Sequence, residues 1–556
     1  MELKYLKKSY WSLEREVSRF GPSSGWSNKD MDPVPPEKRT WTTWDYCFYW
    51  ISDATNAAVW QLASSMIAVG LSWRQAIPAI ATGSGLIASV IVLNGTAGAR
   101  LHIAFPVLNR SSFGFWLSYF SVVSRVVLAM FWFAIQTYTG SECVYQMLKA
   151  IWPSIARVPN RLPESSHITT VGMMCYFLFW IIQFPLMFLS PHKIRHFFTL
   201  KGTLVPIAWL SMLIWAFVKV PASKSLENSH STLSGAAMSW AWLSGLNSAL
   251  GIYATLSVNI PDFTRYAKNE KAQYVQLLII PVAFTLIGFI GISVTAAGEV
   301  LYGEVLWDPL RLIDRWDNRA AAFFASASFL IATIGSNISA NSLSAANDMT
   351  VLFPKYIDIR RGQIICAIIG GWALCPWEIL ASAPGFLSFM SGYTVFLGPF
   401  AGMSVKLTYS VHSTSADFLF CLLNSMVADY WIIHKCKVDV PAMYDPMGRY
   451  RYWKGMNWRA AVALLVSITP TLPGLIHDIN GEIFVGNAAF LFNIAWLYGF
   501  FTSIAVYVPL SIYFPARETF MDRAILADDI LSTDSGSENE IDSEKKDHVS
   551  EVVKTA

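Results

Sequence analysis

Long apolar runs recur along the chain, and short polar connections separate them. An apolar run of about 18 residues or more is long enough for a helix to cross a bilayer. The pattern therefore predicts an all-α polytopic membrane protein. We expect twelve spans, near 44–70, 76–95, 116–150, 168–189, 199–220, 236–258, 273–298, 320–350, 362–382, 384–408, 458–477 and 487–514.

The two ends of the chain are polar and divide it into three parts. Residues 1–43 are mixed in charge and show no cleavable signal peptide, so we expect a cytosolic segment there. Residues 44–516 form the predicted transmembrane domain. Residues 517–556 are predicted to be a disordered acidic tail, because DDILSTDSGSENEIDSE has too little apolar surface to fold alone. The tail is either a solvated end or a regulatory segment. In the second case Ser532, Ser535, Ser537 and Ser543 are phosphorylation sites, and Lys545, Lys546 and Lys554 are available to the ubiquitin and endocytic machinery.

Lysine and arginine are more frequent in the connections on the side of the N-terminus. The loop charges counted there include Lys193, Arg195 and Lys201. Positively charged short loops face the cytosol, and an even number of spans puts both termini on the same side. We therefore expect a multi-pass membrane protein with both termini in the cytosol. The plasma membrane is the expected location.

Composition excludes several other classes of protein. The chain is 54% hydrophobic and 14% charged, with a net charge of +3, whereas soluble domains are about one quarter charged. No HExxH, GxSxG or GxxxxGK[ST] motif occurs, and the seven cysteines form no metal-ligand cluster. We expect no enzyme activity, no cofactor, no metal site and no nucleic-acid partner. The expected partners are a small-molecule substrate and the lipid bilayer.

Two spans contain polar groups that a simple membrane anchor does not need. The first reads YWISDATNAAVWQLASS, and the sixth reads SGLNSALGIYATLSVNIPDF. In the sixth, Gly251 weakens the helix and Asn259 with Pro261 ends it. Breakable helices five spans apart are typical of the discontinuous helices that form a transporter's central site. The alternative is that these residues only join helices together.

Three further spans carry polar or aromatic groups on one helix face. In the third, Trp132 offers a stacking surface and Gln136 both a donor and an acceptor, which suits a flat ring; the alternative is a packed Trp and an interhelical Gln. In the eighth, small residues surround Asn337 and Asn341 and expose backbone carbonyls that can hold a cation. In the tenth span Phe386, Met390 and Tyr393 form a stripe that is either a gate over the site or ordinary core.

Long motifs resemble the nucleobase-cation-symport-1 family, and in particular its fungal uracil and allantoin permease branch. The motifs are FPVLNRSSFG at 105–114, WFAIQTYTG at 132–140, NIPDFTRYAKNEKAQ at 259–273, NSLSAANDMTVLFPKYIDIRRGQ at 341–363 and YRYWKGMNWRA at 450–460. The resemblance covers about 28–515. It implies a five-plus-five inverted-repeat core with two additional C-terminal helices, and a substrate held between spans 1, 3, 6, 8 and 10.

The resemblance also implies which residues bind the substrate and the coupling ion. Substrate contacts map to Asn56, Trp132, Gln136, Tyr253 and Asn341. The family's cation site, which holds sodium in bacterial relatives, maps to Ser52, Thr55, Ala332, Gly335 and Ser336. Gly335 replaces a hydroxyl-bearing residue, which agrees with the proton coupling usual in the fungal branch. Asp53 is the expected proton carrier, the alternative being a structural carboxylate.

One segment departs from the family pattern. FLGPFAG at 396–402 and MVADYW at 426–431 read as one continuous family motif, separated here by an insert at 404–425. The insert is either a retained intron or a looped-out segment at the cytosolic end of span 10.

These observations predict a secondary active importer, a proton symporter, of nucleobase-like solutes such as uracil, allantoin or uric acid. Two alternatives remain at this level. One is a thiamine or nucleoside transporter of the same family, and the other is a transport-inactive nutrient receptor.

Overall fold

The computed structural model describes residues 12–13, 18–21, 26–188, 191–228, 231–402 and 428–529. Within these ranges the chain forms helices and turns, and its few β-bridges are isolated. The insert predicted at 404–425 lies outside the described residues.

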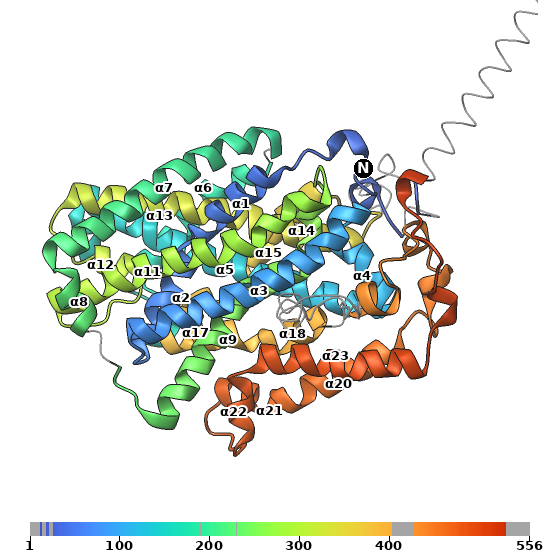
Figure 1. Cartoon of the computed structure of the whole chain (residues 1–556). Helices are drawn as coiled ribbons and strands as arrows, with labels where there is room; N and C mark the ends of the chain where they lie inside the picture. Colours follow the sequence, from blue (N-terminus) through green and yellow to red (C-terminus); the bar gives the residue numbers. More distant parts are fainter. Residues whose placement is uncertain are drawn as a thin grey trace, which may run out of the picture.

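Every predicted span corresponds to a helix or to two consecutive helices (Figure 1). Eight of the described helical segments are long and apolar enough to cross a membrane. The bounds are α1 Thr43–Ala54 with α2 Ala57–Ala68, α3 Trp73–Leu101, α5 Ser118–Ile151, α6 Thr170–Gln183, α7 Pro191–Lys219, α9 Gly235–Asn259, α11 Gln276–Tyr302, α13 Arg319–Ser336 with α14 Leu343–Leu352, α15 Ile359–Trp372, α17 Ala383–Gly392 with α18 Thr394–Gly402, α20 Trp458–Ile468 with α21 Leu472–Ile479, and α23 Ala495–Tyr513.

Short helices form several of the connections. In four of them a proline stands in the first turn, where a missing backbone N–H costs nothing and the ring presets the helical φ. These are α4 Phe105–Phe113, α10 Pro261–Thr264, α12 Pro309–Ile313 and α16 Pro376–Ile379. The other two are α8 Ala222–Asn228 and α22 Ala488–Phe492.

The packing of the first ten spans follows a repeated scheme. In the first half α3 packs against α9 of the second half, and the equivalent helix α11 packs against α1 and α2. The contact between α5 and α6 has its counterpart between α14 and α15. The two halves also meet through the equivalent pairs α3 with α11 and α5 with α13. This is the five-plus-five core, and α20 and α23 pack beside it against α18.

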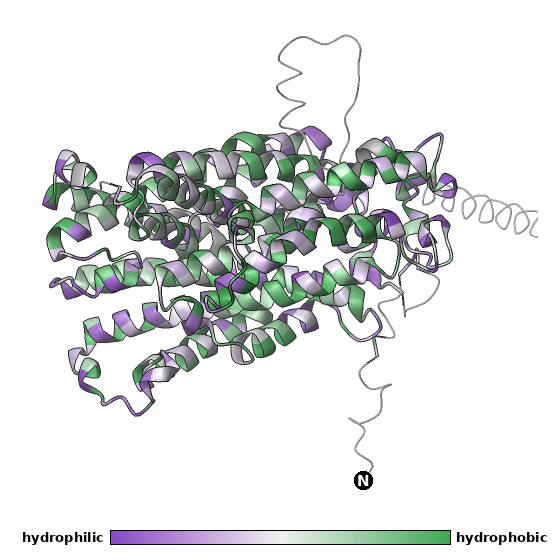
Figure 2. Ribbon diagram, turned by 90° about the horizontal axis from the view of Figure 1, so that it is seen from below, coloured by the Kyte–Doolittle hydropathy of each residue, from purple (hydrophilic) through white to green (hydrophobic). Residues whose placement is uncertain are grey.

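The outer faces of several helices carry exposed apolar side chains. On α7, Ile207, Ile214 and Val218 are 58%, 64% and 77% exposed. Figure 2 shows hydrophobic residues along the length of the helices. A soluble protein rarely exposes large continuous apolar surfaces, so this surface is suited to lipid.

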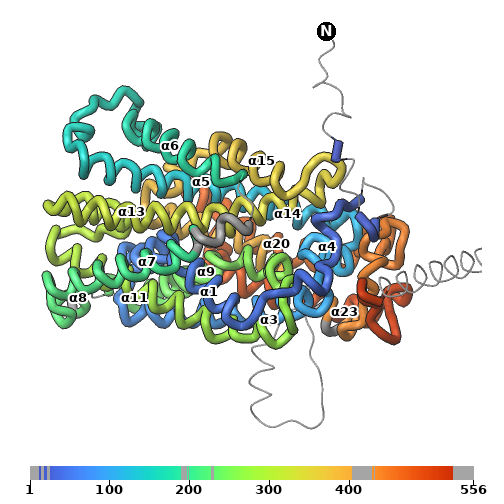
Figure 3. Tube along the Cα trace, turned by 90° about the horizontal axis from the view of Figure 1, so that it is seen from above, coloured from blue at the N-terminus to red at the C-terminus, as the bar shows by residue number. Residues whose placement is uncertain are grey.

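Segments from both ends of the chain lie at one end of the bundle (Figures 1 and 3). The Asn28 side chain donates to the backbone oxygens of Pro354 and Ile357, and the Tyr444 hydroxyl donates to the Met31 oxygen. The predicted tail begins at 517, yet residues 517–529 are packed: Ile525 forms backbone hydrogen bonds with Val438 and Val440.

An ion pair joins the two end segments. The Arg39 guanidinium donates two hydrogen bonds of 2.8 Å to the Asp528 carboxylate, and this lowers the pKa of Asp528. The folded chain therefore continues into the predicted tail as far as the last described residues, and residues 530–556 lie outside them.

Candidate functional site

The first span is interrupted where its polar residues predict a break. α1 ends at Ala54 and α2 begins at Ala57. Asn56 caps α2, because its Oδ1 atom accepts a hydrogen bond of 3.0 Å from the Ala58 N–H. The Thr55 hydroxyl donates to the backbone oxygens of Ile51 and Ser52. The break thus brings backbone ends and short polar side chains into the interior of the bundle.

The sixth span runs through Gly251, the residue predicted to weaken it, and ends at Asn259 as predicted. α9 continues from Gly235 to Asn259. Gly251 permits close helix packing: a Cβ atom there would lie 2.4 Å from the Met390 backbone oxygen. The Tyr393 hydroxyl donates to the Gly251 oxygen at 2.9 Å. A strong tertiary contact therefore keeps a weak helix former in the helix.

The eighth span contains a π-helical turn, Asn337–Ser342, between α13 and α14. Such turns frequently mark functional sites. The Asn337 amide donates to the Gln183 Oε1 atom at 2.9 Å and to the Phe133 oxygen at 3.2 Å. Its own Oδ1 atom accepts from the Asn341 amide at 2.9 Å. Asn337 therefore orients Asn341.

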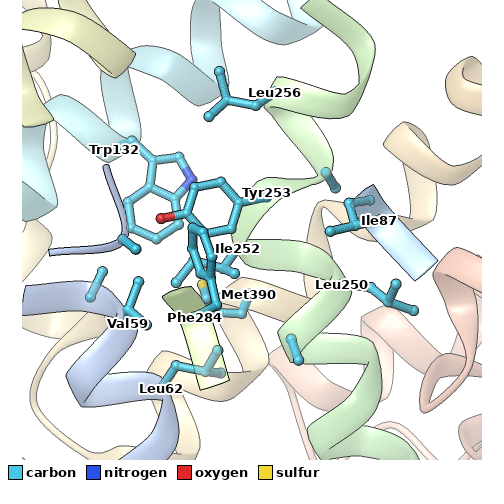
Figure 4. Packing of buried hydrophobic residues seen from close by; sticks show 14 of the residues in the cluster. Val59, Leu62, Ile87, Trp132, Leu250, Ile252, Tyr253, Leu256, Phe284 and Met390 are labelled. Carbon is cyan, nitrogen blue, oxygen red and sulfur yellow. The ribbon is translucent and has the colours of Figure 1, made fainter. Parts of the chain in front are cut away.

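The five predicted substrate residues come together around one small cavity. They come from the α1–α2 break, α5, α9 and the π turn. Figure 4 shows the rings of Trp132 and Tyr253 reaching the same space from α5 and α9. Around the cavity lie Asn56, Trp132, Gln136, Tyr253 and Asn341, together with Asp53, Arg125, Asn259 and Ser344.

Polar atoms in this cavity are only partly paired. The Gln136 amide donates to Asn56 Oδ1 at 2.9 Å, while the buried Gln136 Oε1 atom has no hydrogen-bond partner among the residues that the structure describes. The Tyr253 hydroxyl donates to the Asp53 backbone oxygen at 3.3 Å. A buried acceptor without a donor costs free energy until something pairs with it. A solute with an N–H group would satisfy it.

The predicted gate residues lie beside the cavity rather than around it. Phe386 and Met390 are fully buried, and the Phe386 ring stacks on Trp307 with centroids 6.1 Å apart. Two residues of this span meet Trp132 edge to face: Phe389, with ring centroids 5.7 Å apart, and the predicted gate residue Tyr393, at 6.4 Å. Phe389 belongs to the same aromatic run but was not among the predicted gate residues.

The predicted cation site contains a lysine that the sequence reasoning assigned to a loop. Lys201 lies inside α7 and is 1% exposed. Its ammonium donates to the Ser336 hydroxyl at 3.0 Å. A Cβ atom on Gly335 would lie 2.6 Å from the lysine Cδ atom, so Gly335 makes room for this side chain. The buried Asp53 carboxylate, 4% exposed, interacts electrostatically with it.

Ser52, Thr55 and Ala332 complete the predicted set. Ser52 and Thr55 belong to the interrupted first span, and Ala332 is fully buried in α13 one turn before Ser336. The signal that was missed is a lysine within a long apolar helix, because an isolated buried charge is costly and therefore needs a partner.

A buried ion pair borders the cavity through Arg125. The Arg125 Nη2 atom lies 3.3 Å from the Asp348 Oδ2 atom, and both side chains are almost fully buried. Arg125 also packs over the Phe105 ring at 4.9 Å. The sequence reasoning passed over both residues, although charged side chains inside apolar spans are a functional signal.

Comparisons with known proteins agree with this fold and site. A family described as permease for cytosine/purines, uracil, thiamine and allantoin matches residues 33–418 and 404–499. The two matched segments overlap at 404–418, inside the predicted insert. The uracil permease of Saccharomyces cerevisiae is 34% identical over 469 residues, 82% of this chain and 70% of that permease. The allantoin permease of the same yeast is 36% identical over 469 residues, with the same coverage of both chains.

Solved structures show the same architecture. The inward-facing conformation of Mhp1 matches with a TM-score of 0.67 at 21% identity, over 90% of this chain and 96% of Mhp1. The inverted repeats, the broken first span and the central cavity define a polytopic membrane transporter. The chain belongs to the nucleobase-cation-symport-1 family of permeases for cytosine/purines, uracil, thiamine and allantoin.

Proposed function

We propose that this chain is a proton-coupled importer of a small planar solute with both N–H and C=O groups, such as uracil, allantoin or uric acid. The observation that carries this proposal is the cavity itself. Trp132 and Tyr253 offer two ring faces, and the amides of Gln136 and Asn341 offer donors and acceptors. The permeases named above support the solute class.

The proposed ion coupling rests on Lys201. Its ammonium lies against Ser336 and in the space next to Gly335, where the resemblance places sodium in bacterial relatives. A positively charged side chain in that position repels a sodium ion, so we expect this site not to bind sodium. A proton taken up by Asp53 would cancel the attraction between that carboxylate and Lys201, and so loosen α1 from α7.

We further place the protein in the plasma membrane with both termini in the cytosol. The packed segments at both ends of the chain lie at one end of the bundle, which we assign to the cytosol. α12 lies at the opposite end, which then faces outward.

Uptake of labelled uracil in a transporter-null yeast tests the proposal. Allantoin, uric acid, uridine and thiamine serve as unlabelled competitors, because one of the relatives is a uridine permease. We expect saturable uptake that rises at acidic external pH and does not respond to sodium. A chain that reaches the surface and takes up none of these solutes would instead support a receptor.

A further inference from the structure

A second polar cavity lies at the end of the bundle that carries α12, away from the central site. Its volume is about 440 Å³. One wall is the outer part of α5, and the other is the connection from α11 to α13 that contains α12. Its lining includes Glu142, Gln146, Glu304, Trp307, Arg311 and Asp314.

Two carboxyl groups meet beside this cavity, which Glu142 lines. Glu142 of α5 and Asp308, the N-cap of α12, are in hydrogen-bond contact. Asp308 is 2% exposed. The Glu142 Oε2 atom is buried, and no N–H or O–H group of the described residues donates to it. Two carboxylates offer only acceptors, so they form a hydrogen bond only when one of them carries a proton.

The surroundings favour a shared proton. Burial raises the pKa of Asp308, although Arg311 opposes this. The other groups that act on the pair are Tyr138 of α5 and Gln61 of α2. Gln61 is 1% exposed and neutral, so it does not compensate a second negative charge. Two like charges in a buried site cannot both ionise easily.

The pair also lies between several elements of the fold. Asp308 begins the segment that packs on α5, and the neighbouring Trp307 stacks on Phe386 of α17. Next to the pair, Gln146 and Lys149 hold Asp314 at 2.8 Å and 2.6 Å. The contact between the two carboxyl groups therefore closes α12 over α5 beside the tenth span.

We propose that Glu142 and Asp308 form a second proton-binding site, in which one proton taken from the outer solution is shared between them and seals α12 against α5. The proton bridges the two carboxyl groups and no other bond changes. When it leaves, the two carboxylates repel each other and the outer cavity opens. The assignment of this end to the outside rests on the proposed function.

Cysteine accessibility tests the seal without any transport. Val305 lines the cavity and Cys375 is exposed near the same end of the bundle, where His167 pairs with Glu378. A Val305→Cys chain in intact cells is labelled with a charged, membrane-impermeant methanethiosulfonate. Its labelling rate is divided by that of Cys375, which corrects for thiol ionisation. We expect this ratio to fall roughly tenfold in total from pH 8 to pH 5. Binding of one proton can change the ratio by at most about tenfold per pH unit, so the expected fall lies within that limit.

Variants identify the residues responsible. Glu142→Gln and Asp308→Asn each supply a permanent donor, and the ratio should be low at both pH values. Glu304→Gln is the matched control, because Glu304 lines the same cavity but pairs with Arg315; its pH dependence should be unchanged. A ratio equal at both pH values in the Val305→Cys chain overturns the proposal, as does full pH dependence in Glu142→Gln. Uptake that ignores pH while labelling follows it would refute only the proposed proton coupling.

Discussion

The ammonium of Lys201 donates a hydrogen bond of 3.0 Å to the Ser336 hydroxyl, across the contact between α7 and α13. Asp53 is its buried counter-charge in α1. Removing one of two buried opposite charges is destabilising, because the other is left uncompensated. We therefore expect Lys201→Met to lower the melting temperature of the purified protein. Adding Asp53→Asn to Lys201→Met should restore most of the lost melting temperature. A double variant no more stable than Lys201→Met would show that the two charges do not depend on each other.

The contact between Lys201 and Gly335 predicts that the coupling ion can be changed. Gly335→Ser alone should reduce uptake, since its Cβ atom meets the Lys201 side chain at 2.6 Å. In Lys201→Ala/Gly335→Ser the lysine is absent and a hydroxyl is added to the cation site. We expect uracil uptake by this double variant to become stimulated by sodium. Sodium-stimulated uptake in the unchanged chain would contradict the proposed role of Lys201.

Amide truncation in the central cavity tests the solute contacts. Gln136→Ala and Asn341→Ala should each reduce uptake at least tenfold, roughly the loss expected when a polar group of the solute is left unpaired. Surface levels should stay normal. Ser339→Ala is a suitable control from the same π turn, because its hydroxyl donates only to the Gly335 backbone. Unchanged uptake kinetics in both amide variants would remove these residues from the site.

Glycine packing between α9 and α17 predicts a stability difference. Gly251→Ala puts a methyl group 2.4 Å from the Met390 backbone oxygen, so one helix must shift. Overpacking of this kind costs about 1–3 kcal/mol. Gly85→Ala in α3 is the matched control, since nothing lies within 4 Å of the added atom. Thermal unfolding in detergent compares the two, and an equal effect would refute the packing role of Gly251.

The two parts of the C-terminal segment should respond differently to truncation. Ending the chain after Asp529 keeps the ion pair with Arg39 and removes the serines and lysines beyond it. We expect normal uptake and longer residence at the plasma membrane, because phosphorylation and ubiquitin acceptor sites are lost. Ending it after Ala516 also removes the contact with Val438, and should lower surface expression. Loss of transport by the longer chain at the correct location would make the distal tail structural.

Periodicity and motif determined the architecture because apolar length in a bilayer leaves few alternatives to helices. The break near Asn56 was likewise predictable, since several short polar side chains interrupt an apolar run there. The gathering of Trp132 and Gln136 with Tyr253 and Asn341 followed from the resemblance, and the fold places them around one cavity.

Only the tertiary structure decided what depends on distant neighbours. Local propensity predicted a weak point in the helix at Gly251, and the close contact with Met390 shows what the glycine provides in the continuous helix α9. The predicted topology placed Lys201 in a loop at the membrane surface. In the structure Lys201 lies within α7 and contacts Ser336, which comes from a distant part of the sequence. Glu142 is a charged residue within an apolar span, but Asp308 lies in a connection and the sequence does not show that the two meet. Their proposed role depends on their contact in the folded protein, because the ionisation of a buried carboxyl depends on which groups the fold places beside it.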